Sequence, residues 1–292
     1  MYFPYLVARG EESEALISTV CKYSDSNIIP ILEPYNDDED ELYSYSKLLK
    51  LVESLVANKK TFIILINNED DLSVLKGKFS DLDDFCIHGY NNSNKNYLTD
   101  RQNIAIIHCS QNYLVNDQDN IKYNIFMPEV LRFSTYINKY NSEKTVLVED
   151  GFIRHEPNSD YPAVEDFNSE LCFTYKIGGL CGFGDFTILE YGYQPTGGAR
   201  ANDITHVIHL TKKESDTLNK MVVRHFLTTP SSEPDNRDRS AKTIQKAYSA
   251  KNEFLKTVGI DWIIEKNPNG TSLGMYKRIG IAHHIELIHS LI

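Results

Sequence analysis

The sequence predicts a single α/β domain with a TIM-barrel-like (β/α)8 fold. Short apolar segments of strand length, rich in β-branched or aromatic residues, recur along the chain. Their near-continuous apolar character is typical of parallel strands that are covered on both faces. Segments with helical spacing lie between several of them, and this alternation favours right-handed βαβ units. An open doubly wound sheet is the alternative.

Eight segments are predicted to be strands, and eight βα units would close a barrel. The count of eight is uncertain at two places, so the open sheet stays an alternative. The segment after Phe85 is short and polar, and Asp150–Gly179 shows no regular strand or helix pattern. The predicted strands are Tyr5–Ala8, Ile28–Leu32, Phe62–Ile66, Phe85–His88, Ile104–His108, Thr145–Val148, Leu180–Phe183 and Thr205–Leu210.

Three segments between these strands are predicted to be crossover helices. In Glu41–Ala57, apolar residues recur with helical spacing and lysines occupy the opposite face. Glu12–Lys22 and Ile125–Tyr140 are expected to play the same part. Each of these helices should bury one stripe against the sheet.

The pattern changes after the last predicted strand. Glu214–Phe226 and Arg239–Val258 are interpreted as helices, separated by the Pro-containing loop Thr228–Asp238. Residues 212–272 are therefore predicted to be a helical insertion or lid within a single domain spanning 1–292. Leu273–Ile292 is expected to form a final helix that packs on the sheet.

Composition excludes several classes of protein. A net charge of −11 over 292 residues opposes non-specific binding to nucleic acid, which depends on Lys and Arg. No apolar segment is long enough to span a bilayer, and Met1–Gly10 lacks the features of a signal peptide. The five cysteines are odd in number and form no Cys-x-x-Cys pair. We therefore expect a cytoplasmic protein with reduced cysteines and no membrane association.

Polar residues follow the predicted strands, where a barrel would gather its binding site. Glu33, Asp150 and Asp185 are the candidate catalytic residues, and Glu33 is held between Pro30 and Pro34. Clustered carboxylates either share protons or coordinate a divalent cation such as Mg²⁺ or Mn²⁺. For each residue taken alone, a solvated strand end is the competing interpretation.

Cationic and imidazole side chains are the candidate ligand-binding groups. Arg9 follows the first strand, and Arg200 follows a Gly-Gly pair whose amides could receive a phosphate. Lys277 could stabilise developing negative charge, and His209 ends the eighth predicted strand. His283 and His284 lack the i, i+4 histidine pair of a metalloprotease helix, which disfavours zinc hydrolysis. Packing at a helix start is their favoured role, and hydrogen bonding or contact with a phosphate is the alternative.

Several short motifs are distributed along the chain. They are Tyr2-Phe3-Pro4-Tyr5-Leu6, Ile29-Pro30-Ile31-Leu32-Glu33-Pro34, Glu149-Asp150-Gly151-Phe152, Asn158-Ser159-Asp160-Tyr161-Pro162, Gly182-Phe183-Gly184-Asp185-Phe186, Val207-Ile208-His209-Leu210-Thr211 and His283-His284-Ile285-Glu286-Leu287. These motifs resemble those of the phage beta-protein family and its bacterial relatives, and the resemblance covers essentially the whole chain. It implies a role in host–phage conflict beside a small nuclease-like partner, and it points to Asp160 as a further site residue together with Arg9, Glu33, Asp150, Asp185, His209, His283 and His284.

Three functions remain open on the sequence. The chain could be a component of a phage-defence or mobile-element gene pair that binds a nucleotide-like or phage-derived ligand at the barrel mouth. It could instead be a metal-dependent phosphodiester or nucleotide hydrolase. Arg9-Gly10 resembles the His-Arg-Gly opening of glycerophosphodiester phosphodiesterases, but Ala8 stands at the position of the histidine. The third alternative is a non-catalytic interaction scaffold.

Overall fold

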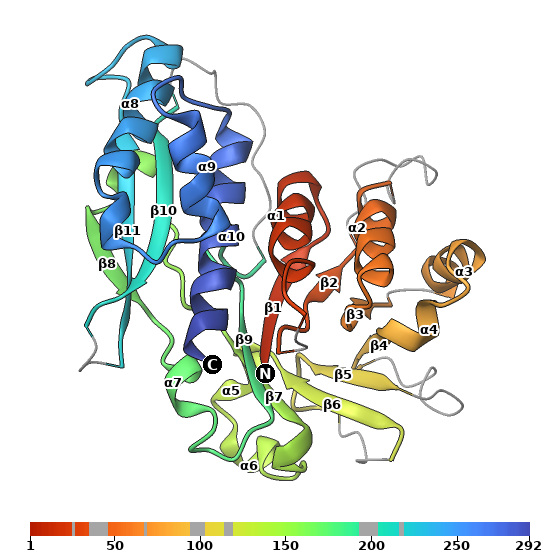
Figure 1. The fold of residues 1–292 in the computed structure, drawn as a ribbon. Helices are drawn as coiled ribbons and strands as arrows, with labels where there is room; N and C mark the ends of the chain where they lie inside the picture. The colour runs from red at the N-terminus through yellow and green to blue at the C-terminus, as the bar shows by residue number, and fades with distance from the viewer. Residues whose placement is uncertain are drawn as a thin grey trace. The chain divides into compact units, whose positions relative to one another are not determined.

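A computed structural model describes residues 1–24, 27–34, 46–66, 69–93, 103–113, 119–192, 204–215 and 219–292 (Figure 1). The chain divides into two compact units. The first contains Met1–Glu149 and Leu171–Asp185, and the second contains Asp150–Glu170 and Phe186–Leu291. The sequence predicts one domain over residues 1–292, whereas the chain leaves the first unit, returns to it and leaves it again.

The first unit contains a closed barrel of parallel strands, which confirms the predicted TIM-barrel-like fold (Figure 1). Strands β1 and β9 pair in parallel, with Tyr2 opposite Phe183, and this pairing closes the barrel. In their order around the barrel the strands are β1 (Tyr2–Val7), β2 (Ile31–Glu33), β3 (Phe62–Leu65), β4 (Cys86–Asn91), β5 (Ile104–His108), β6 (Ile121–Phe126), β7 (Thr145–Glu149) and β9 (Gly182–Asp185).

Two sequence predictions about this barrel are wrong. Strand β6 begins before Ile125–Tyr140, the segment expected to be one helix, and extends into it. Pro128 explains the error, because proline fits the first turn of a helix but not its interior. It begins the short helix α5 (Pro128–Leu131), and α6 (Ser134–Ile137) follows. The predicted eighth strand, Thr205–Leu210, is a strand of the second unit.

The other helices of the first unit follow the predicted pattern more closely. Helix α2 buries Leu48, Val52 and Leu55, which belong to the predicted apolar stripe, and it also buries Leu51. The helices are α1 (Gly10–Val20), α2 (Ser46–Ala57), α3 (Glu69–Lys78), α4 (Leu82–Phe85) and α7 (Leu171–Thr174), with a 3-10 turn at Ser142–Lys144.

Glycines in β9 allow the barrel to close tightly. A Cβ atom on Gly184 would lie 2.3 Å from the carbonyl oxygen of Phe3, and one on Gly182 would lie 2.4 Å from the Phe3 ring. The sequence suggests that these glycines let a ligand approach the backbone. In the structure the group that approaches them is the neighbouring strand β1.

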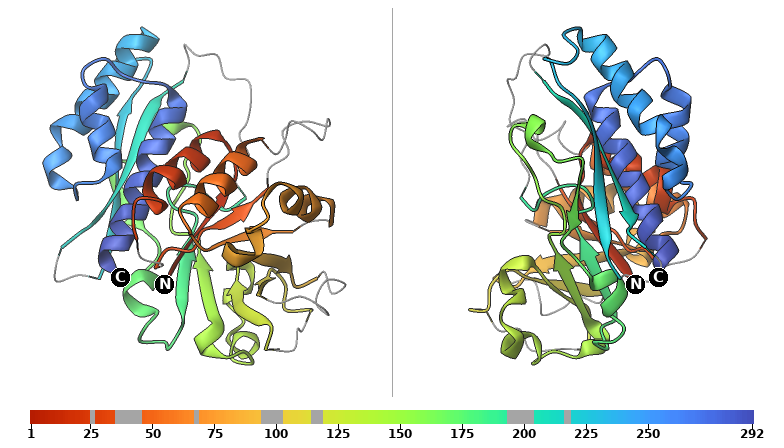
Figure 2. Two further views of the ribbon diagram at one scale, coloured as in Figure 1. Left: turned by 45° about the vertical axis from the view of Figure 1, so that its right-hand side comes forward. Right: turned by 90° about the vertical axis from the view of Figure 1, so that its left-hand side faces the viewer.

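The second unit is an antiparallel sheet with the order β10–β11–β8 and helices on one face (Figure 2). Ile208, Leu210 and Phe226 pack with apolar residues of the helices into one core. The elements are β8 (Val164–Phe167), β10 (His206–Lys213), β11 (Met221–Thr228), α8 (Asn236–Ser249), α9 (Val258–Lys266) and α10 (Leu273–Leu291), with 3-10 turns at Asn158–Asp160 and Lys251–Glu253.

These elements correct the predicted helical lid of residues 212–272. The segment Glu214–Phe226, expected to be a helix, contains most of β11. Its Val222 and Val223 are β-branched residues, which fit a strand better than a helix. The predicted final helix is confirmed as α10, which packs beside β10.

The described residues contain no candidate membrane-spanning helix and no disulfide bond. Within the residues that the structure describes, no helix combines the length and apolar character needed to cross a bilayer. All five cysteines are free thiols, and Cys86 and Cys172 are buried.

Candidate functional site

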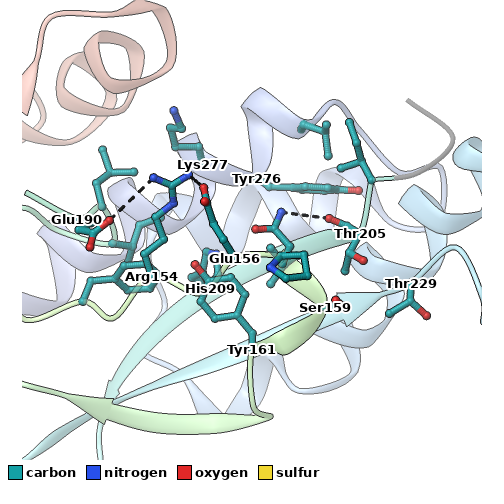
Figure 3. Close-up of a pocket in the computed structure, with 18 of the residues that line it drawn as sticks. Arg154, Glu156, Ser159, Tyr161, Glu190, Thr205, His209, Thr229, Tyr276 and Lys277 are labelled. Atoms are coloured by element: carbon teal, nitrogen blue, oxygen red, sulfur yellow. Dashed lines mark hydrogen bonds and ion pairs between the residues drawn. The ribbon is translucent and has the colours of Figure 1, made fainter. Parts of the chain in front are cut away.

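A cavity of about 1140 Å³ lies within the second unit (Figure 3). Its walls come from the connection between β7 and β8, the turn that follows β9, strand β10, the loop between β11 and α8, and the first turn of α10. Its volume slightly exceeds that of typical small-molecule sites, which measure about 300–1,000 Å³. These segments are distant in sequence, so the second unit must fold to create the cavity.

Charged side chains gather at one side of this cavity and hydroxyl groups at the other (Figure 3). The guanidinium of Arg154 forms an ion pair with Glu156 and lies 3.9 Å from Glu190. Lys277 of α10 adds a second positive charge. The charged residues are Arg154, Glu156, Glu190 and Lys277, and the hydroxyl-bearing residues of the opposite side include Ser159, Thr205 and Thr229.

A chain of three imidazoles and one carboxylate lies behind the cavity wall. His209 of β10 stands opposite His225 of β11, and their Nδ1 atoms are 2.7 Å apart. His225 Nε2 lies 2.9 Å from one carboxylate oxygen of Glu165, although neither atom makes an aligned hydrogen bond. His155 Nε2 lies 3.0 Å from the other oxygen. Glu165 of β8 therefore bridges two histidines.

Aromatic rings pack against the two inner imidazoles of this chain, His209 and His225. Tyr161 stacks on His225 with ring centroids 4.7 Å apart and meets the edge of His209 at 4.6 Å. Phe152 packs against His209 at 5.0 Å. Burial lowers the pKa of His225 to about 4, and burial also lowers the pKa of His209 well below its ordinary value. Both imidazoles are therefore neutral at pH 7.

The proton positions follow from the neighbours of the two rings. The carboxylate of Glu165 favours a proton on His225 Nε2, which leaves His225 Nδ1 as an acceptor. His209 must then donate from its own Nδ1, because two bare nitrogens would repel at 2.7 Å. This assignment leaves His209 Nε2 with a lone pair. No group among the described residues forms a hydrogen bond with that atom, and His209 lines the cavity.

Three predicted ligand-binding residues belong to this region. His209 and Lys277 line the cavity. Asp160 is exposed and accepts a hydrogen bond from Ser159, which lines the cavity together with Tyr161. Arg200 lies outside the described residues.

The structure does not bring the predicted catalytic carboxylates together. Glu33 accepts a hydrogen bond from Tyr5 at 2.9 Å, and buried Asp185 accepts one from Tyr2 at 2.7 Å. Tyr2 and Tyr5 are three positions apart on β1, so they point to opposite faces of the barrel sheet. Glu33 and Asp185 therefore also lie on opposite faces.

Asp150, the third predicted catalytic carboxylate, belongs to no metal-binding cluster among the described residues. Asp150 belongs to the second unit, where its carboxylate accepts the backbone N–H of Tyr191 at 3.0 Å. Within the described parts of the chain, no group of three or more His, Cys, Asp or Glu residues is arranged to hold a metal ion.

The remaining predicted residues are buried. Arg9 is 9% exposed and precedes helix α1. Both ring nitrogens of His283 are bonded within the second unit, to the Thr257 hydroxyl at 2.8 Å and to the Thr211 carbonyl at 2.7 Å. His284 lies 3.1 Å from the Thr211 hydroxyl. The two histidines join α10 to β10, which agrees with the packing role that the sequence favours.

Sequence reasoning missed most of the residues that surround His209. His225, Glu165 and His155 are far apart or unremarkable in the sequence, and no motif connects them. The available signal was the alternation along β10 and β11, which places His209 and His225 on the face away from the apolar core residues. Using that signal requires the strand register, which the sequence does not provide.

Comparison with known proteins identifies no relative. No protein-family model, curated protein or solved structure matches this chain. The resemblance to the phage beta-protein family stays a prediction from motifs.

Proposed function

We propose that the cavity of the second unit binds a nucleotide-like ligand. The observation that carries this proposal is the arrangement of its lining, with Lys277 and Arg154 on one side and hydroxyl groups on the other. A phosphate can accept hydrogen bonds from the cations, while sugar and base groups can bond to Ser159 and Thr205. The aromatic ring of Tyr161 adds an apolar contact surface.

The charge balance favours an organic phosphate over a simple anion. Two carboxylates, Glu156 and Glu190, offset the positive charges of Arg154 and Lys277, so the formal charges of this group cancel. A bare anion would gain little net attraction there. A ligand that carries hydroxyl or amino donors in addition to a phosphate can satisfy both the cations and the carboxylates.

Replacing Lys277 with alanine is expected to weaken nucleotide binding at least about tenfold, which corresponds to about 1.4 kcal/mol. The variant removes one of the two cations of the cavity lining while leaving its hydroxyl groups in place. Isothermal titration calorimetry with a panel of nucleoside monophosphates, triphosphates and cyclic nucleotides would measure the effect.

Lys256→Ala is the matched control for this measurement, because Lys256 is exposed and does not line the cavity. It is expected to bind as tightly as the unmodified protein. The proposal fails if no member of the panel binds, or if Lys277→Ala and Lys256→Ala bind equally well.

The motif resemblance extends this proposal to a biological setting. We propose that ligand binding is communicated to a small nuclease-like partner as part of phage defence. Co-purification of the two proteins, with and without the bound nucleotide, tests this extension. A complex that never forms under either condition would remove it while leaving the binding proposal intact.

A further inference from the structure

We infer that His209 is a general base and that the cavity hydrolyses phosphodiesters without requiring a metal ion. This inference rests on the proposed function, because the substrate would occupy the nucleotide site. It adds a reaction and a catalytic residue to that site. Its basis is the arrangement of His209, which lines the cavity, with His225 and Glu165 behind it.

His209 meets the geometric requirements for a base. Its Nδ1 is held by His225 at 2.7 Å, which fixes the ring and leaves Nε2 to accept a proton. The side chain lines the cavity, so Nε2 can contact a water molecule beside a bound substrate. Phe152 and Tyr161 pack against the ring and limit its rotation.

Glu165 and His225 act behind this base as positioning residues. The carboxylate of Glu165 lies 2.9 Å from His225 Nε2, where it favours the tautomer that accepts from His209. When His209 gains a proton, the negative charge of Glu165 stabilises the new positive charge through His225. This is the same logic by which a buried carboxylate supports the histidine of other hydrolases.

The proposed step is a balanced hydrolysis. His209 Nε2 takes a proton from water as the water oxygen forms a bond to phosphorus. The phosphorus–oxygen bond to the leaving group breaks, and its electron pair stays on the leaving oxygen. Lys277 and Arg154 stabilise the charge on the other phosphate oxygens. The proton on His209 then passes to the leaving oxygen or to solvent, which yields a phosphomonoester and an alcohol.

The charge of the substrate supports this assignment of roles. Neutral His209 starts with a free lone pair, and a bound phosphodiester carries a negative charge that stabilises the imidazolium formed during the step. The rate is therefore expected to rise with pH as His209 becomes neutral and then to reach a plateau.

Hydrolysis of bis(p-nitrophenyl) phosphate in EDTA tests the inference. The unmodified protein is expected to release p-nitrophenolate, and His209→Asn is expected to lose at least about 100-fold in kcat. Glu165→Gln is expected to lose about tenfold and to shift the pH profile, an effect that a merely structural role would not produce. His289→Gln, near the end of α10 and outside the cavity lining, is the control and should keep full activity.

The outcomes separate this inference from the proposed function. Nucleotide binding without turnover would overturn the base and leave the binding site standing. Turnover that vanishes in EDTA and returns with Mg²⁺ or Mn²⁺ would overturn the metal-independent step, and so would full activity in a folded His209→Asn protein. Fluorescence of Trp262 in α9, the one tryptophan, reports whether the second unit of each variant is folded. If His209→Asn does not fold, His209→Gln and Glu165→Gln decide the question.

Discussion

Gly184→Ala is expected to destabilise the barrel by about 3 kcal/mol, because overpacking a tight site typically costs about 1–3 kcal/mol or more. The new methyl group would lie 2.3 Å from the backbone oxygen of Phe3, and backbone cannot yield as a side chain can. The contact falls between β1 and β9, where the barrel closes. Urea unfolding followed by far-ultraviolet circular dichroism measures the change.

Gly77→Ala is the matched control, since nothing lies within 4 Å of a Cβ atom at that position in helix α3. It is expected to stabilise the protein by about 0.5–1 kcal/mol, because alanine favours helix more than glycine does. The two alanines should therefore act in opposite directions. Equal stability of Gly184→Ala and the unmodified protein would show that the barrel seam tolerates a side chain.

Acidification is expected to destabilise the second unit through its buried histidines. Burial lowers the pKa of His283 from 6.5 to about 4, and the ring is fully buried between Thr257 and Thr211. Between these pH values the unfolded chain binds a proton that the folded chain does not. Stability from His283 is therefore fully present above pH 6.5 and is lost as pH falls toward 4.

The size of this effect follows from the separation of the two pKa values. The difference between 6.5 and about 4 corresponds to about 3 kcal/mol for His283, of which about 2 kcal/mol should be lost by pH 5. His225, with its pKa also lowered to about 4, should add a similar amount. Urea unfolding at pH 7 and pH 5, followed by Trp262 fluorescence, measures the sum in the unit that contains both histidines.

His283→Gln isolates one histidine, because its amide can still bond to Thr211 and Thr257 but does not titrate. The loss of stability between pH 7 and pH 5 should shrink by about 2 kcal/mol in this variant. A pH dependence that is identical in His283→Gln and the unmodified protein would contradict the assigned role of His283.

Local patterns in the sequence predict most of the barrel. Segments such as Phe62–Ile66 and Ile104–His108 are apolar and β-branched throughout, and in the structure they contain the buried strands β3 and β5. The helical spacing in Glu41–Ala57 likewise predicts α2. The pattern failed at β6, where Lys122 and Asn124 interrupt the apolar run. That strand is held by its neighbours β5 and β7, whose contribution a local pattern cannot contain.

The sequence by itself predicted the parallel barrel and the final helix. It also named His209 and Lys277 as ligand-binding residues, but it placed them at the mouth of the barrel, whereas both line the cavity of the second unit. Only the tertiary structure decided that the predicted eighth strand, β10, joins β11 and β8 in a second sheet, that Glu33 and Asp185 face opposite sides, and that His225 and Glu165 support His209. The physical reason is the range of the interactions. Strand and helix patterns arise between residues close in the chain, whereas a site depends on register and strand pairing between segments that are far apart in it.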